Sequence, residues 1–181
     1  NGESILEKYH IKVLRKVIET EEACNIISQF SEAKKQDFWN IVEKSILGTD
    51  MAVHDDIVNE VTSWAKGEII LDFNKMDDQI ALCRALLHCA DLSNPVRDFK
   101  CSRFWSERIA NEFTNQVARE RREGIIPDAY MVQQTILSQY KSEIGFIKYV
   151  GKPLWLSLGT LYPSVSMLSR QLEDNIRQYE E

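Results

Sequence analysis

The stretch from His88 to Pro95, "HCADLSNP", brings an imidazole, a carboxylate, a hydroxyl and an amide together just before a proline. Asp91 and Asn94 are three residues apart, a spacing that predicts both side chains on one helical face. A carboxylate can ligate a divalent cation and an amide can hydrogen-bond a ligand, so the pair could serve one cavity. The same residue types are common at helix ends, and composition alone favours a cap.

The elements that position these residues are predicted to be helices. An apolar residue recurs at every fourth position from Ile5 to Val17, which predicts an amphipathic helix over about residues 4–19. Ser31 has the residue type of a helix N-cap, and one long helical pattern follows it as far as Trp64.

The second half of the chain shows the same periodicity. The segment "KGEIILDFN" interrupts it as a loop, and a helix is then predicted over about residues 77–93, because Pro95 disfavours helical geometry at the preceding residue. Further helices are expected over about residues 102–122, 128–149, 152–159 and 165–179. The breaks fall at "EGIIPD", "VGKP" and "YPS". With only 7 Gly and 4 Pro and no repeat, the sequence predicts an all-α fold.

The composition of the chain limits the classes of function that it can have. The chain has 181 residues, which suits one domain, and its 44% hydrophobic and 28% charged residues are typical of a folded protein. A net charge of −6 argues against nucleic acid polymers as partners, because phosphate binding depends on clustered Lys and Arg. No apolar stretch approaches the roughly 20 residues that a membrane span requires.

The cysteines and the first residue suggest where the protein works. The four cysteines are Cys24, Cys83, Cys89 and Cys101, and they include no Cys-x-x-Cys pair, so we expect reduced, buried thiols. The sequence has no signal-peptide pattern, and we therefore expect a cytoplasmic location. The chain begins with Asn1 inside a helical pattern, which suggests a segment of a longer protein.

Several blocks together resemble one family. "ALLHCADLSNP" closely resembles the metal-ligating segment of class I 3′,5′-cyclic-nucleotide phosphodiesterases, especially the cAMP-specific, dunce-like type. The resemblance continues in order through "TDMAVH", "FWSERIANEF", "KSEIGFIKYVGKPLW" and "LEDN", and it covers nearly all of residues 1–181. It implies a compact all-α, multi-helix domain of the HD-type metallohydrolase kind, and ordered blocks of this specificity outweigh the capping interpretation.

The resemblance also implies cofactors and metal-site residues. Family members hold two divalent metals, usually zinc and magnesium, with manganese as an alternative, and Asp91 matches a zinc ligand. Thr49 and Asp50 match polar residues that orient metal ligands and waters, and Glu7 matches the acid that supports the catalytic His. Each of these three also has an ordinary explanation as a surface or capping residue.

The family's remaining metal ligands and its general-acid His are missing from this sequence. They lie in motifs of the form H-N-x-x-H and H-D-x-x-H-x-G, upstream of the helix that carries Glu7. The three histidines, His10, His54 and His88, occur in neither motif, and we interpret them as structural residues. We therefore expect residues 1–181 to be the C-terminal part of a catalytic domain that is inactive alone.

The resemblance assigns a nucleotide pocket as well. Phe146 matches the aromatic residue that stacks on the purine, and Asn94 matches a residue that reaches toward the base. Ile109 and Phe113 match pocket walls, and Met51 matches the pocket mouth. The stripe formed by Trp105, Ile109 and Phe113 is equally consistent with a core, in which Trp105 is a buried support.

Glu143 departs from the family. It stands where a Gln normally holds the purine edge, and its spacing from Phe146 keeps the two on one helical face. An ionised Glu can only accept hydrogen bonds, which favours adenine over guanine, whereas a raised pKa restores a donor and weakens that preference.

Three functions remain open from the sequence. The first is hydrolysis of a cyclic nucleotide, with cAMP favoured and cGMP as an alternative, by metal-activated water in the intact protein. The second is a catalytically inactive binding or regulatory module with the same fold, and the third, a generic helical interaction protein, requires accidental motif matches. A dimer and upstream regulatory domains are also compatible with the sequence.

Overall fold

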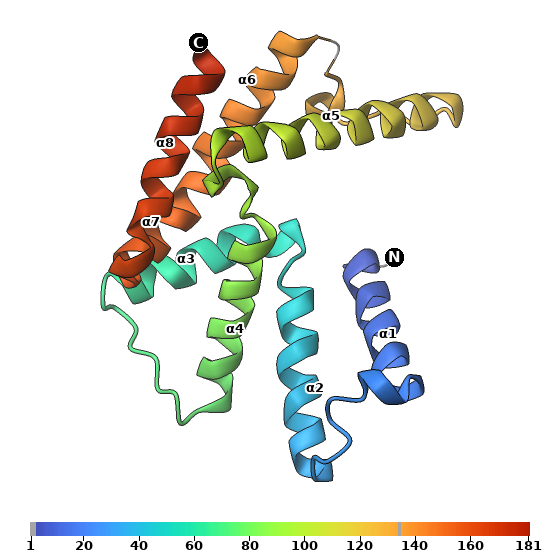
Figure 1. Cartoon of the computed structure of the whole chain (residues 1–181), viewed down its shortest axis with the longest axis vertical. Helices are drawn as coiled ribbons and strands as arrows, with labels where there is room; N and C mark the ends of the chain where they lie inside the picture. The colour runs from blue at the N-terminus through green and yellow to red at the C-terminus, as the bar shows by residue number, and fades with distance from the viewer. Residues whose placement is uncertain (1–2, 134) are drawn as a thin grey trace. The chain divides into compact units, whose positions relative to one another are not determined.

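The computed structural model describes residues 3–133 and 135–181, and these form helices and connecting loops without a strand (Figure 1). The all-α prediction is confirmed. Asn1, which suggested a longer protein, lies outside the described residues. The chain divides into two compact units, Asn1–Asp91 and Leu92–Glu181.

Four helices make up the first unit. They are α1 (Ile5–Thr20), α2 (Glu32–Leu47), α3 (His54–Ala65) and α4 (Met76–Asp91), with 3₁₀ turns at Glu22–Cys24 and Met51–Val53. The helix predicted over residues 4–19 and the loop predicted after Trp64 are both confirmed.

The single long pattern predicted from Ser31 to Trp64 is wrong, because two helices occupy it. Ser31 does cap α2, since its hydroxyl accepts from the backbone N–H of Lys34 at 3.4 Å. The helix ends at Gly48, where α4 approaches so closely that a Cβ would lie 2.3 Å from Cγ of Arg84. The absence of a side chain at position 48 is therefore required by a residue of another helix.

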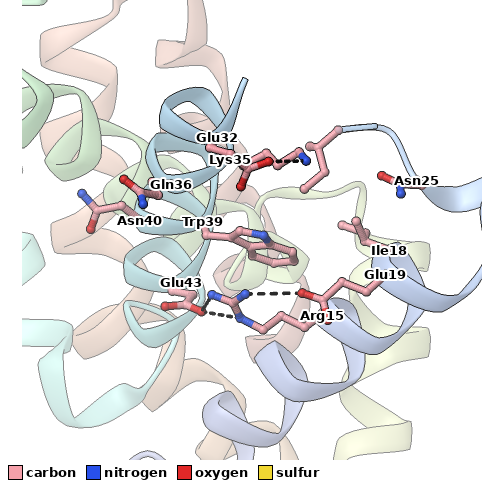
Figure 2. A pocket seen from close by; sticks show the side chains of 11 residues that line it. Arg15, Ile18, Glu19, Asn25, Glu32, Lys35, Gln36, Trp39, Asn40 and Glu43 are labelled. Atoms are coloured by element: carbon pink, nitrogen blue, oxygen red, sulfur yellow. Dashed lines mark hydrogen bonds and ion pairs between the residues drawn. The ribbon is translucent and has the colours of Figure 1, made fainter. Parts of the chain in front are cut away.

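One buried cluster of the first unit lies between α1 and α2. Ile18, Ile27 and Trp39 are buried there, and the guanidinium of Arg15 lies 4.2 Å from the centre of a Trp39 ring (Figure 2). Arg15 also pairs with Glu43 of α2, with Nη2 and Oε1 2.6 Å apart. A cation over an indole that also binds a carboxylate holds α1 to α2 more firmly than apolar packing alone.

The apolar stripe predicted on α1 is exposed. Ile5 is 66% and Tyr9 61% exposed, and Val13 and Val17 of the same stripe are also exposed. A helix buries the face that its neighbours cover, and α2 covers the opposite side of α1, which carries Ile18.

The second unit begins with a 3₁₀ turn. Its elements are η3 (Asn94–Val96), α5 (Phe99–Arg122), η4 (Ala129–Met131), α6 (Ile136–Phe146), a π-helical turn η5 (Ile147–Gly151), α7 (Lys152–Leu161), η6 (Pro163–Val165) and α8 (Ser166–Glu180). Its core contains fully buried side chains from the π turn, α7 and α8: Ile147, Leu154 and Leu172.

Two predictions about this unit are wrong. The helix predicted over residues 128–149 begins only at Ile136, where Thr135 and Ser138 form a capping box. The break predicted at "VGKP" does not occur, because the π turn Ile147–Gly151 carries the helix directly into α7, whose first turn contains Pro153.

The cysteines are free thiols, but most of them are not buried. Cys24 and Cys83 are exposed and Cys101 is partly exposed, so the prediction of buried thiols holds only for Cys89. Burial raises the pKa of Cys89 to about 12, which keeps this thiol protonated. Within the described part of the chain, no helix combines the length and apolar character needed to cross a membrane.

Candidate functional site

The turn after α4 differs from its predicted geometry. The helix ends at Asp91, whose side chain is exposed, and Asn94 begins the 3₁₀ turn η3. Asp91 and Asn94 therefore do not lie on one continuing helical face, and that prediction is wrong. The cause is local, since Pro95 ends the α-helical geometry earlier than the periodicity suggested.

The side chain of Asn94 makes one hydrogen bond to the backbone, and its amide oxygen is left without a partner among the described residues. Its Nδ2 donates to the carbonyl of Ser102 at 3.2 Å. Its Oδ1 is buried and has no hydrogen-bond partner among the described residues. A buried acceptor without a partner costs about 1–3 kcal/mol, so it is a natural place for a ligand or water to donate.

Two buried side chains fix the turn that carries Asn94. Nδ2 of Asn175, on α8, donates to the carbonyls of Pro95 at 2.8 Å and Arg97 at 2.9 Å. Nε1 of Trp155, on α7, donates to the carbonyl of Leu92 at 3.2 Å. Sequence reasoning named "LEDN" only as a matching block, and local spacing contains no signal for this long-range role of Asn175.

Polar residues predicted near the metals act as caps in the structure. The hydroxyl of Thr49 donates to the carbonyl of Ile46 at 2.8 Å. The carboxylate of Asp50 accepts from the hydroxyl of Ser4 at 2.6 Å and from the N–H of Ala52 at 2.9 Å. These bonds lower the pKa of Asp50, with Ser4 contributing most. Such contacts agree with the capping explanation that the sequence left open.

The remaining predicted residues of the first unit differ in exposure. Glu7 is half-buried on α1, and Met51 is 47% exposed in the turn before α3. His10 is exposed, so its side chain is not part of the core.

His54 and His88 form a buried pair. Nδ1 of His54 and Nε2 of His88 are 2.9 Å apart, so one ring donates and the other accepts. Burial lowers the pKa of His88, the neighbouring His54 lowers it further, and Asp91 acts in the opposite direction. The interpretation of His54 as a hydrogen-bonded structural residue is confirmed.

Glu143 lies on α6 with a hydroxyl donor beside it. Its Oε2 accepts from Oγ of Ser106, on α5, at 2.9 Å. Burial raises the pKa of Glu143, and the bond from Ser106 opposes this shift. Phe146, half-buried, follows three residues later at the end of α6, so its spacing matches a pair on one helical face.

The aromatic stripe of α5 is not core. Trp105 is 47% exposed and Ile109 43%, so the predictions of a core stripe and of Trp105 as a buried support are wrong. The buried face of α5 carries small residues instead, including Ser106 and Ala110, one position later. Phe113 is half-buried and meets the ring of Tyr130 edge-on, with ring centres 5.7 Å apart.

The donors needed for a metal centre are incomplete in the described residues. Asp91 is a single carboxylate, and no group of three or more His, Cys, Asp or Glu side chains in the described ranges could hold a metal ion. One carboxylate leaves most coordination positions of a divalent ion to water. The side chains described here do not, by themselves, fit two bound metals.

The structure also contains a cavity of about 610 Å³ between α1 and α2 (Figure 2). Its apolar surface comes from Ile18, Ile27 and Trp39, and the Arg15–Glu43 pair forms part of its wall. No residue predicted from the sequence to bind nucleotide or metal lines this cavity.

Comparisons with known proteins agree with one another. The family model described as 3′5′-cyclic nucleotide phosphodiesterase matches residues 1–172. A 3′,5′-cyclic-AMP phosphodiesterase 4C of Rattus norvegicus is 34% identical over 188 residues, covering 99% of this chain and 34% of the relative. A probable 3′,5′-cyclic-AMP phosphodiesterase of Caenorhabditis elegans is 28% identical, covering 99% of this chain and 27% of the relative.

A solved structure is also similar. The phosphodiesterase domain of a RhoPDE fusion protein from the choanoflagellate Salpingoeca rosetta matches with a TM-score of 0.92 and 28% identity. The match covers 98% of this chain and 56% of that one. The chain spans 27% to 34% of the length of the curated relatives it matches.

Proposed function

The chain belongs to the 3′,5′-cyclic nucleotide phosphodiesterase family, and from this we propose that the protein containing it hydrolyses cyclic nucleotides to 5′-nucleoside monophosphates. In this reaction water attacks phosphorus, the bond to O3′ breaks and O3′ takes up a proton. The match of the family model over residues 1–172 carries the proposal. The rat and nematode relatives are named for cyclic AMP, which supports cAMP as the preferred substrate.

We assign base recognition to α6. Phe146 would stack on the purine and Glu143 would meet its edge, and their spacing on α6 supports this pairing. Ile109 and Phe113 of α5 would form pocket walls, and Asn94, with its free Oδ1, would accept from the nucleotide.

The family depends on divalent metals, and we propose zinc and magnesium, with manganese as the alternative. Asp91 would supply one ligand. Since the described residues hold no complete donor group, the remaining ligands and the general acid would come from helices outside this chain. Thr49, Asp50 and Glu7 would then orient ligands around that site, and Met51 would line the substrate entrance.

The exposed apolar stripe on α1 supports the proposal that residues 1–181 are the C-terminal part of a catalytic domain. Ile5 and Tyr9 are more than half exposed, and burial of such side chains stabilises a protein by about 1.5–3 kcal/mol each. This stripe is therefore a suitable surface for the missing helices. A cytoplasmic location, a dimer and regulatory domains stay predictions.

The central experiment uses the intact protein. Asp91→Asn should lower bound zinc, measured by elemental analysis, and lower cAMP turnover by orders of magnitude, because a ligand to the metal is lost. Asp77→Asn, an exposed change at the other end of α4, is the matched control and should alter neither. Metal content that stays unchanged in Asp91→Asn rules out Asp91 as a ligand.

Base recognition is tested separately. Phe146→Ala should weaken nucleotide binding by about 1–3 kcal/mol, the usual contribution of one stacked base. Glu143→Gln should shift the ratio of kcat/KM for cAMP and cGMP toward cGMP, because an amide both donates and accepts. A ratio that does not move shows that Glu143 does not read the base.

A second candidate is a catalytically inactive binding module, which the departure at Glu143 favours. A buried carboxylate in place of an amide weakens pairing with either purine. This candidate predicts that the intact protein binds cyclic nucleotide in equilibrium dialysis and releases no 5′-monophosphate.

A further inference from the structure

The cavity between α1 and α2 is separate from every residue assigned above to nucleotide or metal binding. Its volume of about 610 Å³ is in the range of small-molecule sites in proteins. Its lining residues all come from α1, from α2 or from the segment that joins them, so the whole cavity lies in the first unit. The chemistry of the lining indicates what this cavity can bind.

The floor of the cavity is apolar and already packed. Ile18, Ile27 and Trp39 line it and are each at most 9% exposed, and partly buried apolar side chains pack against them. Figure 2 shows the ring of Trp39 projecting from α2 toward Ile18 on α1. Aromatic rings pack well edge-to-face or offset against an indole. The floor therefore favours an aromatic ring as the apolar part of a ligand.

The cations in the wall already have partners. Nη2 of Arg15 lies 2.6 Å from Oε1 of Glu43, and its Nη1 lies 3.6 Å from Oε1 of Glu19 (Figure 2). Nζ of Lys35 lies 2.8 Å from Oε1 of Glu32. An anionic ligand, including the phosphate of a nucleotide, would have to displace a carboxylate from one of these cations. The lining thus disfavours an anion.

The charge of the lining favours a cation instead. Three carboxylates and two cations contribute to it: Glu19, Glu32, Glu43, Arg15 and Lys35. The carboxylates are in excess, so the lining has a net negative charge. Charge complementarity therefore selects a cationic ligand over an anionic one of the same shape.

Asn25 provides a polar anchor. It follows the 3₁₀ turn after α1 and lines the cavity. Its Oδ1 is buried and has no hydrogen-bond partner among the described residues. An ammonium group can donate to this oxygen, whereas a carboxylate or phosphate oxygen cannot. A ligand that donates here would satisfy a buried acceptor that the protein leaves unpaired.

We propose that the cavity between α1 and α2 binds a small arylalkylamine. The aromatic ring lies on the floor formed by Ile18, Ile27 and Trp39, and the ammonium group donates to Oδ1 of Asn25. The site does not depend on the proposed function, because it shares no residue with the assigned nucleotide pocket.

The first test uses tryptamine as the probe at neutral pH, where its amine is charged. Binding to the 181-residue chain is followed by nitrogen-15 NMR through the indole N–H signal of Trp39, which is assigned by its loss in Trp39→Phe. Tryptamine should shift this signal saturably and bind at least about tenfold more tightly than indole-3-propionate, its anionic counterpart. The neutral analogue 3-ethylindole should be intermediate. Equal affinities for the three probes, or a signal that tryptamine does not shift, overturn the proposal.

The second test changes the acceptor. Asn25→Ala should weaken tryptamine binding about tenfold, which corresponds to about 1.4 kcal/mol. Asn25→Asp keeps an acceptor and adds a negative charge, so it should bind at least as tightly as the wild type. Asn59→Ala, an exposed change on α3, is the matched control and should leave binding unchanged. If Asn25→Ala does not fold, Asn25→Leu replaces it, since leucine has a similar volume and no acceptor.

The outcomes separate this site from the proposed function. Wild-type affinity in the folded Asn25 variants that lack the acceptor overturns the proposal and leaves hydrolysis untouched. Displacement of tryptamine by cAMP at the Trp39 signal also overturns it, because the cavity would then be a nucleotide site. Absence of cAMP hydrolysis by the intact wild-type protein contradicts the proposed function, while the tryptamine titration still decides whether the cavity binds an amine.

Discussion

Burial raises the pKa of Glu143 while a single hydroxyl, that of Ser106, acts against the shift. The sequence showed that a carboxyl replaces an amide here, but not which protonation state the protein favours. A neutral carboxyl can donate a hydrogen bond and an ionised one can only accept, so burial favours the form that donates and the bond from Ser106 favours the form that accepts. The protonation of Glu143 is a balance between desolvation and one hydrogen bond.

This balance predicts a pH dependence of stability. The pKa of Glu143 is higher in the folded than in the unfolded chain. The stability that this difference contributes to the folded chain is fully present below the ordinary pKa of 4.5, and it is lost as pH rises through the folded pKa. Glu143→Gln has no proton to lose and should lack this decline, so its stability advantage should grow with pH.

Urea unfolding of both chains from about pH 4 to about pH 8 measures this difference. Glu112→Gln, an exposed carboxyl on α5, is the control and should follow the wild type. A stability difference between Glu143→Gln and wild type that is the same at every pH contradicts the prediction.

Asn175 is the residue that most directly holds the turn carrying Asn94. Asn175→Ala removes two bonds to the carbonyls of Pro95 and Arg97 and leaves both acceptors without this donor. We expect a loss of about 2–4 kcal/mol in the free energy of unfolding, measured by urea denaturation. Gln178→Ala, exposed on the same helix, should cost less than about 0.5 kcal/mol, and equal costs for the two would refute the structural role of Asn175.

At the scale of elements, the close approach between α2 and α4 requires a glycine at position 48. A methyl group at Gly48 would collide with Cγ of Arg84, so Gly48→Ala should lower the free energy of unfolding by about 1–3 kcal/mol. Gly145 of α6 has no heavy atom within 4 Å of the same methyl position. Gly145→Ala should therefore raise stability by up to about 1 kcal/mol, because Ala has the higher helix propensity.

Thermal and urea unfolding of the two glycine variants provide the comparison. If Gly48→Ala is as stable as the wild type, Arg84 moves aside and the contact does not require glycine at this position. If Gly145→Ala is strongly destabilised, its methyl position is not open.

At the scale of the whole molecule, the exposed apolar face of α1 offers a surface for association. Tyr9 and Val13 belong to an apolar stripe that α2 does not cover, and contiguous exposed apolar patches promote association. The chain alone should self-associate as its concentration rises. Tyr9→Glu with Val13→Glu should reduce this association without loss of helix content.

Sedimentation velocity across a concentration series, with circular dichroism as the folding check, measures the effect. Lys12→Glu, a change on the same helix outside the stripe, is the matched control and should retain association. Association that is identical in the stripe variant and the control would show that another surface is responsible.

Local patterns in the sequence determined most of the helices and the family. The period of the apolar residues predicted α1 within one residue at each end, and Ser31 was correctly predicted as an N-cap. Ordered motifs predicted the phosphodiesterase family and the all-α fold. These features depend on residues within a few positions of one another, which is why they can be read without coordinates.

Only the tertiary structure decided the remaining features, because each depends on a residue far away in sequence. The need for glycine at position 48 depends on Arg84, and the turn at Asn94 depends on Asn175, whose bond partner Pro95 is 80 positions away. The hydroxyl at Glu143 comes from Ser106, 37 positions away. Helical periodicity describes which face of a helix is apolar, but which face is covered, and which polar group meets which, is set by packing between helices.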